Sequence, residues 1–320
     1  MANSFVALKI VMVMDPIESI KVAKDTSFAL LLEAQRRGHH IHIAAIGDLG
    51  ARDGKAFVRA RALTVRDDAH DWFTASAPQQ RPLSDFDLAF MRSDPPVDAP
   101  YLHATQILGM AQNEGALVVN DPAGLRDLNE KLAALLFPHC CPPTVVSADP
   151  AILKAFVAAH GDCVLKPLDG MGGRSIFRAH SGDANINVIL ETLTQEGRSF
   201  AMAQTYLPEI VDGDKRILLI DGEPVPYCLA RIPQGDEFRG NLAAGGRGEG
   251  RPLSERDRWI AAQVGPELRR RGMRLVGLDV IGDWLTEINV TSPTCIRELD
   301  AEFDLNIAGD LFDRIEVTRA

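Results

Sequence analysis

The sequence predicts an α/β domain followed by a larger α+β region, and three observations support this division. The first 120 residues alternate apolar strand-like runs with helical spacing, which favours a doubly wound parallel sheet. After about residue 125, strand patterns separated by turn signals favour antiparallel pairing. Two glycine-rich segments, at 167–173 and 232–251, interrupt this second region. A chain of 320 residues is long enough for two or three domains.

The elements of the first third follow from apolar runs and capping residues. Residues 10–14 form a continuous apolar run, typical of a parallel strand covered on both faces. Asp25 offers a helix N-cap, and Gly38 closes the helix that follows. We expect further parallel strands at 40–46, 87–91 and 116–120. Asp15 and segment 92–96 follow two of these strands, at the ends where such sheets bind ligands.

The elements of the second region read as mixed helices and hairpins. Helical patterns are expected at 125–137, 150–160 and 254–271. Strand patterns are expected at 163–166, 174–177, 201–207, 216–221, 226–231, 275–281 and 285–290.

Composition excludes several classes of function. The 44 acidic and 34 basic residues give a net charge of −10, which disfavours general binding of nucleic acid or anionic membranes. Five cysteines without a C-x-x-C spacing argue against a disulfide framework or zinc knuckle, and reduced thiols in the cytoplasm are expected. The apolar run at 6–14 is too short to span a membrane and lacks a cleavage site.

Lys166 marks a candidate phosphate site. It ends a predicted strand and is followed by Gly170, Gly172 and Gly173, so a cation stands beside free backbone N–H groups. The residue order is not that of a P-loop, and a plain hairpin with a flanking lysine is the alternative. Lys131, on the predicted helix 125–137, reads as a surface lysine unless the phosphates need a second cation.

A candidate metal site lies near the end of the chain. Glu287 and Asn289 are two residues apart, so on a strand they share one face, and their oxygens suit Mg²⁺. Asp279 joins them only if it pairs with Glu287, which requires a three-residue loop or a β-bulge. A regular two-residue turn at 282–283 would pair Asp279 with Thr286 and turn it away. A solvated polar strand face is the alternative.

Further cations stand near these segments. Arg216 and Arg231 end apolar runs, and they suit charge on a transferring phosphoryl group if they face the metal strands. The alternative is that the two arginines are ordinary snorkelling side chains, with the apolar stem buried and the charged end in water. Segment 232–251 is expected to be a lid without regular structure, because glycines alternate there with Arg239, Asn241 and Arg247. A disordered insertion is the alternative to a lid.

Several motifs together resemble the bacterial glutathione synthetases of the ATP-grasp superfamily. They are Asn-Glu-Lys-Leu at 129–132, Leu-Lys-Pro-Leu-Asp-Gly-Met-Gly-Gly at 165–173, and the motifs at 13–17, 92–96, 232–235, 241–248 and 286–294. The resemblance runs over residues 5–318. It implies an ATP-grasp fold with an N-terminal domain (1–125), a central lobe with a small glycine-rich lid (126–200), and a C-terminal lobe (201–320). The large lid at 232–251 and the metal site would belong to the C-terminal lobe.

The resemblance implies roles for individual residues. Those expected to bind ATP are Lys131, Lys166, Gly172, Gly173, Gln204, Tyr206, Leu207 and Asn289. The expected metal ligands are Asp279, Glu287 and Asn289, and the expected catalytic arginines are Arg216 and Arg231. Those expected to bind substrate are Asp15, Arg92, Arg239, Asn241, Arg247, Ser292 and Thr294.

The resemblance also implies an activity. ATP would phosphorylate the C-terminal carboxylate of γ-glutamylcysteine, and glycine would attack the acyl phosphate to give glutathione. ATP and two Mg²⁺ ions are implied, with Mn²⁺ as a substitute, in a cytoplasmic homotetramer. No cysteine is assigned to catalysis. The alternatives are another ATP-grasp carboxylate–amine ligase, such as one like D-alanine–D-alanine ligase or a ribosomal-tail glutamate ligase, and a non-catalytic ATP-binding regulator of the same fold.

Overall fold

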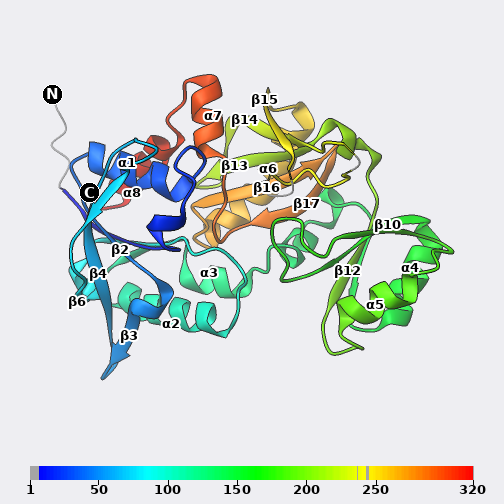
Figure 1. Ribbon diagram of the computed structural model, residues 1–320, viewed down its shortest axis with the longest axis horizontal. Helices are drawn as coiled ribbons and strands as arrows, with labels where there is room; N and C mark the ends of the chain where they lie inside the picture. Colours follow the sequence, from blue (N-terminus) through cyan, green and yellow to red (C-terminus); the bar gives the residue numbers. More distant parts are fainter. Residues whose placement is uncertain (1–6, 236, 243–244, 320) are drawn as a thin grey trace.

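The computed structural model describes residues 7–235, 237–242 and 245–319. Its strands form three sheets. In Figure 1 the sheet of the first domain lies at the left, the C-terminal sheet in the centre and the central-lobe sheet at the right. The first sheet has the strand order β3-β4-β2-β1-β7-β8, with β5 and β6 paired to β4. The central-lobe sheet has the order β11-β10-β12-β9, and the C-terminal sheet has the order β15-β14-β13-β16-β17. Both of the later sheets are antiparallel, as the hairpin signals predict.

The parallel core of the first sheet is confirmed. Strand β1 (Lys9–Val13) lies between β2 (His40–Ala44) and β7 (Leu88–Met91), and β7 pairs in parallel with β8 (Leu117–Val119). The Asp25 side chain accepts from the backbone N–H of Phe28 at 2.6 Å and caps α1 (Thr26–Arg36). Helix α2 (Ala99–Asn113) begins at a second aspartate cap, Asp98.

An antiparallel extension of this sheet was not predicted. Between β2 and β7 the chain forms β3 (Leu49–Arg52), β4 (Lys55–Val65), β5 (Phe73–Ala75) and β6 (Gln79–Pro82). Strand β4 pairs antiparallel with β2, so the sheet is mixed. Short 3₁₀ turns, η2 (Ile46–Asp48) and η3 (Leu83–Asp85), connect this extension to β2 and β7, and another, η1 (Ile17–Ser19), lies between β1 and α1.

The predicted helix at 125–137 is wrong. The chain forms α3 (Pro122–Asp127), leaves the helix, and resumes as the 3₁₀ segments η4 (Leu132–Leu136) and η5 (Pro138–Cys140). The Asn129 side chain accepts from the N–H groups of Lys131 and Leu132, and this local turn competes with helical hydrogen bonding. The break lets the backbone carbonyl of Glu130 accept from the N–H of Ile288.

The central lobe has its own apolar core. Its strands are β9 (Thr144–Ser147), β10 (Asp162–Pro167), β11 (Phe177–His180) and β12 (Ala201–Thr205). Helices α4 (Pro150–His160) and α5 (Ile186–Thr194) cover one face, and their Leu153, Val157 and Leu190 pack with Leu165 of β10. Strand β11 begins where the predicted strand at 174–177 ends, because the glycine-rich loop extends through residue 176.

The C-terminal sheet carries most of the charged candidates. Its strands are β13 (Asp214–Ile220), β14 (Glu223–Ile232), β15 (Arg247–Pro252), β16 (Leu275–Ile281) and β17 (Trp284–Asn289), and η6 (Pro208–Asp212) leads into it. Helix α6 (Glu255–Arg270) packs against β14 and starts at a Ser254–Asp257 capping box. The expected structureless loop at 232–251 is therefore partly wrong, because β15 pairs with β14 from Ile232↔Arg247 onward.

The end of the chain returns to the first domain. Helix α7 (Ile296–Phe303) leads into α8 (Ile307–Arg319), which packs beside α1 (Figure 1). Phe312 is buried and lies 5.9 Å from the ring of Phe90 in β7. Glu316 accepts from Arg37 and also contacts the ring of the buried His39. The N-terminal domain and the C-terminal lobe therefore share apolar cores, whereas the sheet β11-β10-β12-β9 and its two helices have a separate one.

All five cysteines are buried and free. In the ranges that the structure describes, no helix is long and apolar enough to cross a membrane.

Candidate active site

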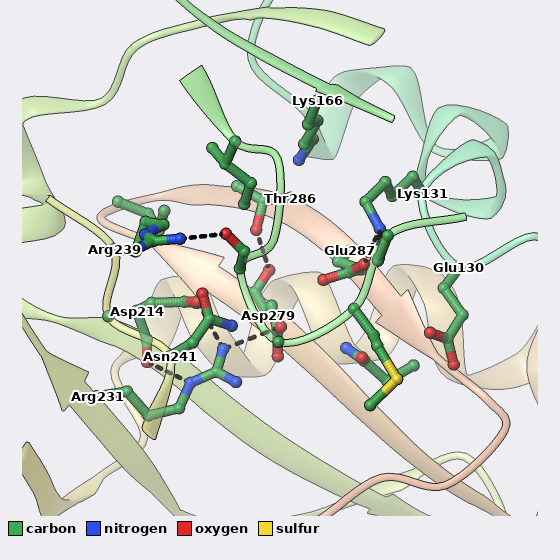
Figure 2. Close-up of a pocket in the computed structure, with 18 of the residues that line it drawn as sticks. Glu130, Lys131, Lys166, Asp214, Arg231, Arg239, Asn241, Asp279, Thr286 and Glu287 are labelled. Atoms are coloured by element: carbon green, nitrogen blue, oxygen red, sulfur yellow. Dashed lines mark hydrogen bonds and ion pairs between the residues drawn. The ribbon is translucent and has the colours of Figure 1, made fainter. Parts of the chain in front are cut away.

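A cavity of about 350 Å³ lies between the central-lobe sheet and the C-terminal sheet. Lys166 enters it from β10, while Asp279 and Glu287 enter from β16 and β17 (Figure 2). It brings together most of the residues singled out in the sequence. Those that line it are Lys131, Lys166, Gly172, Gly173, Gln204, Tyr206, Leu207, Arg216, Arg231, Arg239, Asn241, Asp279, Glu287, Asn289, Ser292 and Thr294.

The register of the β16–β17 hairpin satisfies the condition set by the metal hypothesis. Asp279 pairs with Glu287, and a bulge lies between this pair and the next one, Val280↔Leu285. The turn at 282–283 has two residues, which by itself would pair Asp279 with Thr286. Thr286 is instead the additional, unpaired residue of the bulge, so Asp279 pairs with Glu287. Asp279 and Glu287 are therefore neighbours, two register positions from the pair Gly277↔Asn289, so Asn289 lies on the same face of the sheet as Glu287.

Asp279 is held by two arginines. Arg216 lies opposite it on β13 and donates from Nε at 2.6 Å and from Nη2 at 3.2 Å. Nη2 of Arg231 lies 2.9 Å from the same carboxylate. Burial alone would raise the pKa of Asp279, but the two guanidinium groups hold that pKa well below its usual range. The group stays ionised although its side chain is almost fully buried.

Asp214 belongs to the same cluster and was not singled out in the sequence. It lies opposite Arg231 in the β13–β14 pairing and accepts from Nη2 of that residue at 2.6 Å. Its second oxygen is buried without a partner among the described residues. Burial, together with the charge of Asp279, raises the pKa of Asp214 to about 6 despite Arg231. The i, i+2 spacing of Asp214 and Arg216 on one strand is the signal that could have found it.

The two lysines have different partners. Lys131 donates from Nζ to Glu287 Oε1 at 2.8 Å and to the carbonyl of Gly170 at 2.6 Å. Burial would lower the pKa of Lys131, but Glu287 and neighbouring carboxylates raise it overall. Lys166 donates to the neutral amide of Gln204 at 3.3 Å. Burial lowers the pKa of Lys166, and in the described part of the chain this lysine forms no ion pair.

The carboxylate and amide oxygens of this part of the cavity have the chemistry that suits a divalent cation also bound by phosphate. Asn289 donates from Nδ2 to the carbonyl of Gly277 at 3.2 Å, which leaves its amide oxygen for a ligand. Gly277 has no side chain, and this leaves room for Arg216. A Cβ atom added at Gly277 would lie only 2.8 Å from Cδ of Arg216. Among the described residues, no three His, Cys, Asp or Glu side chains are placed to hold a metal alone. Mg²⁺ commonly takes one or two carboxylates and completes its shell with substrate phosphates and water.

The two glycine-rich segments touch each other over the cavity. Arg239 donates from Nη1 to the carbonyl of Gly173 at 2.6 Å, the contact drawn as a dashed line in Figure 2. Gly173 has a positive φ of 80°, and a Cβ there would lie 2.7 Å from Oδ1 of Asn241. A side chain at this position would therefore be strained and would clash with the large loop.

Three of the expected substrate residues do not line the cavity. Arg247 is exposed on β15, where it pairs with Glu249 at 2.8 Å. Asp15 is exposed and accepts from the N–H of Asp94 at 3.2 Å. Arg92 is buried and reaches Ser27 Oγ and the carbonyl of Pro293, both at 3.0 Å. Asp94 does line the cavity, so the segment after β7 that contains Arg92 still borders it.

The segment that joins the two lobes borders one part of the cavity. Gln204, Tyr206 and Leu207 line it, and the guanidinium of Arg178 stacks 3.7 Å from the ring of Tyr206. Buried cations and carboxylates around a cavity between two antiparallel sheets are the arrangement found in ATP-grasp enzymes.

Comparison with known proteins supports this class and narrows it. Models of the prokaryotic glutathione synthetase N-terminal domain and ATP-grasp domain match residues 8–126 and 130–304. The chain therefore belongs to the prokaryotic glutathione synthetase family. It is 68% identical over 314 residues to a glutathione synthetase of Xanthomonas campestris pv. campestris, covering 98% of this chain and 99% of that one.

A glutathione synthetase of Escherichia coli strain K12 is 57% identical over 309 residues, 97% of this chain and 98% of the relative. The fold also resembles solved structures with little sequence identity. The D-cycloserine synthetase DcsG gives a TM-score of 0.66 at 16% identity, over 95% of this chain and 99% of that one. The ATP-grasp ligase PsnB with a minimal precursor gives 0.62 at 17% identity, over 98% and 100%.

Proposed function

We infer that the chain is an ATP-dependent carbon–nitrogen ligase that joins γ-glutamylcysteine and glycine to give glutathione, ADP and phosphate. The observation that carries this inference is the row of charges across the C-terminal sheet. Arg216, Asp279 and Glu287 stand at one register position on three neighbouring strands, and Lys131 closes the row. Family membership over nearly the full chain selects this reaction from those that the fold supports.

The first step transfers the γ-phosphoryl group of ATP to the substrate carboxylate. A carboxylate oxygen forms the new O–P bond, the bond between the β- and γ-phosphates breaks, and ADP leaves. Lys131 and Lys166 line the cavity and would bind the phosphates. Arg216 and Arg231 also line it and would place positive charge beside the transferring phosphoryl group. Glu287, Asn289 and Asp279 would hold divalent metal, which supplies charge neutralisation between the phosphates when bound.

The second step forms the peptide bond. The amine of glycine attacks the acyl carbon, the C–O bond to phosphate breaks, and the amine loses a proton. Water would hydrolyse the acyl phosphate, so the site must be covered during this step. The loop between β14 and β15 contacts the small glycine-rich loop through Arg239, which supports its role as a lid. No protein nucleophile is needed.

The remaining assignments are part of the proposal. We assign the nucleotide to Lys131, Lys166, Gly172, Gly173, Gln204, Tyr206, Leu207 and Asn289, and the dipeptide to the side that holds Arg239, Asn241, Ser292 and Thr294. Asp15, Arg92 and Arg247 stay predictions for substrate. We propose Mg²⁺ as the metal, two ions per site, with Mn²⁺ as a substitute. From the resemblance we also propose a homotetramer and the domain boundaries 1–125, 126–200 and 201–320. The cytoplasm is proposed as the location on the resemblance and on the free cysteines.

Substrate-dependent release of ADP tests the function. With Mg²⁺-ATP, γ-glutamylcysteine and glycine together, we expect equal amounts of ADP and glutathione. Omitting the dipeptide should abolish ADP release, and omitting glycine should reduce it to slow hydrolysis. A different amine acceptor used in preference to glycine would favour another carboxylate–amine ligase. No ADP release with any pair would favour a binding-only protein.

A further inference from the structure

Glu130 is a half-buried carboxylate that the proposed chemistry does not use. It lies in the segment where a helix was expected, and it borders the cavity near Lys131 and Glu287 (Figure 2). Placing a carboxylate out of contact with water is costly unless hydrogen bonds compensate it. Its partners therefore indicate what the residue is for.

The contacts of Glu130 bracket Asn289. Its backbone carbonyl accepts from the N–H of Ile288 at 2.8 Å, on one side of Asn289. Its side-chain Oε1 accepts from the N–H of Val290 at 3.0 Å, on the other side. The same oxygen accepts from the N–H and the hydroxyl of Thr291, at 3.1 and 2.8 Å. One residue thus fixes the backbone before and after a proposed metal ligand.

A second side chain, that of Asn120, also binds the backbone of Val290, at its carbonyl group. Asn120, which follows β8, donates from Nδ2 to the carbonyl of Val290 at 2.7 Å and to that of Leu275 at 2.8 Å. The N–H of Val290 is therefore held by Glu130 and its carbonyl by Asn120. Val290 does not continue a ladder, since β17 ends at Asn289, so these two side chains replace strand pairing there.

The residue next to Glu130 completes the arrangement. Lys131 donates to Glu287. Glu130 and Lys131 are consecutive, and they therefore contact the strand around Asn289 and at Glu287, the two proposed metal ligands of β17. Lys131 also reaches the carbonyl of Gly170 in the small glycine-rich loop. A displacement of Glu130 would move Lys131 and Asn289 together, because they share one backbone segment and one strand end.

We propose that Glu130 is a positioning residue, which sets the orientation of Asn289 toward the metal-bound phosphates through the hydrogen bonds accepted by its Oε1. The inference rests on the proposed nucleotide and metal site. Groups that orient metal ligands typically change metal affinity or activity by about 10- to 100-fold when removed.

Calorimetric titration with ADP, with and without Mg²⁺, tests the proposal without requiring turnover. In Glu130→Ala we expect ADP alone to bind as in the wild type, while the gain in affinity on adding Mg²⁺ falls about tenfold or more. Glu130→Gln keeps an acceptor oxygen, so we expect it to retain that gain within about threefold, since loss of a neutral hydrogen bond is modest. Thr291→Val removes one donor at nearly constant volume and should give an intermediate loss.

Glu316→Gln serves as the matched control. Glu316 is a buried carboxylate on α8, where it contacts Arg37 and His39. We expect this variant to unfold at lower temperature and to keep the full effect of Mg²⁺ on ADP binding.

The outcomes separate the two levels of inference. Lack of any Mg²⁺ effect on ADP binding in the wild type would overturn the proposed site itself. A wild-type Mg²⁺ effect that survives in Glu130→Ala would overturn only the positioning role. If Glu130→Ala does not fold, a Thr291→Val variant indistinguishable from the wild type would overturn it. A loss in Glu130→Gln as large as in Glu130→Ala would also overturn it, because charge rather than hydrogen bonding would then be responsible.

Discussion

Neutralising Asp279 should destabilise the C-terminal lobe and at the same time leave metal-free nucleotide binding intact. The carboxylate accepts two hydrogen bonds from Arg216, at 2.6 and 3.2 Å, and lies 2.9 Å from Nη2 of Arg231. Its relative exposure is 2%. In Asp279→Asn the side-chain shape is kept, but two buried guanidinium groups lose their shared counter-charge.

The expected magnitude follows from this burial. Removing one partner of a buried ion pair typically costs about 3–5 kcal/mol, because the other charge stays buried. Arg231 retains Asp214 as a partner, so we expect the lower half of this range. With a urea m-value of about 2–3 kcal/mol per M, the midpoint of unfolding should fall by roughly 1–2 M.

Tryptophan fluorescence provides the assay, because Trp259 and Trp284 both lie in the C-terminal lobe. Asp214→Asn is the control, since it removes one contact of Arg231 and leaves Arg216 paired; its cost should be smaller. Metal-free ADP should bind Asp279→Asn at least as tightly as the wild type, because the arginines are freed toward phosphate. A loss below about 1 kcal/mol, or weaker metal-free binding, would refute the reasoning.

Three further outcomes are expected. Glu287→Ala and Asn289→Ala should each lower the ligation rate at least 100-fold while circular dichroism stays unchanged, and near-normal turnover in either would refute the metal assignment. Replacing residues 234–245 with a short glycine–serine linker should keep ADP binding but yield less glutathione per ADP; unchanged coupling would show that the loop is no lid. The raised pKa of Asp214 means that the folded chain takes up a proton near pH 6 while the unfolded chain stays ionised to about 3.8. Wild-type stability relative to Asp214→Asn should therefore increase as pH falls from 7 toward 5, and a constant difference in midpoint would contradict this.

The parts of the fold that the sequence predicted are those with strong local signals. The apolar run in β1, the cap at Asp25 and the long helix α6 all depend on patterns within a few residues. The antiparallel strands between β2 and β7 were missed, because β4 alternates buried residues with exposed charges in a segment with few apolar runs. The helix at 125–137 failed because a tertiary pairing of Glu130 with β17 outweighs helical spacing.

The site was predicted best where the chemistry restricted the geometry. Requiring Asp279 and Glu287 to share a face left two possibilities, an odd loop or a bulge, and the structure has the bulge. Nothing local in the sequence distinguishes the two, because a Gly-Asp turn suits either. The contacts of Glu130 could not be predicted, since its partners lie about 160 residues further along the chain. Asp214 was missed although its spacing to Arg216 was a usable signal, because its pairing with Arg231 is made across two strands.

The distribution of ion pairs in the cavity indicates how an acidic chain can bind a polyanion. Three of its cations, Arg216, Arg231 and Lys131, are each paired with a carboxylate. Lys166 differs from them, because among the described residues its side chain donates to the neutral amide of Gln204. A cation bound at Glu287 would compete with Lys131 for the charge of the same carboxylate. Metal at Glu287 would thus release Lys131 toward a phosphate, while phosphate would supply the ligands that the protein lacks. Nucleotide and divalent metal should therefore each strengthen binding of the other by the same factor, since coupling between two binding equilibria is reciprocal.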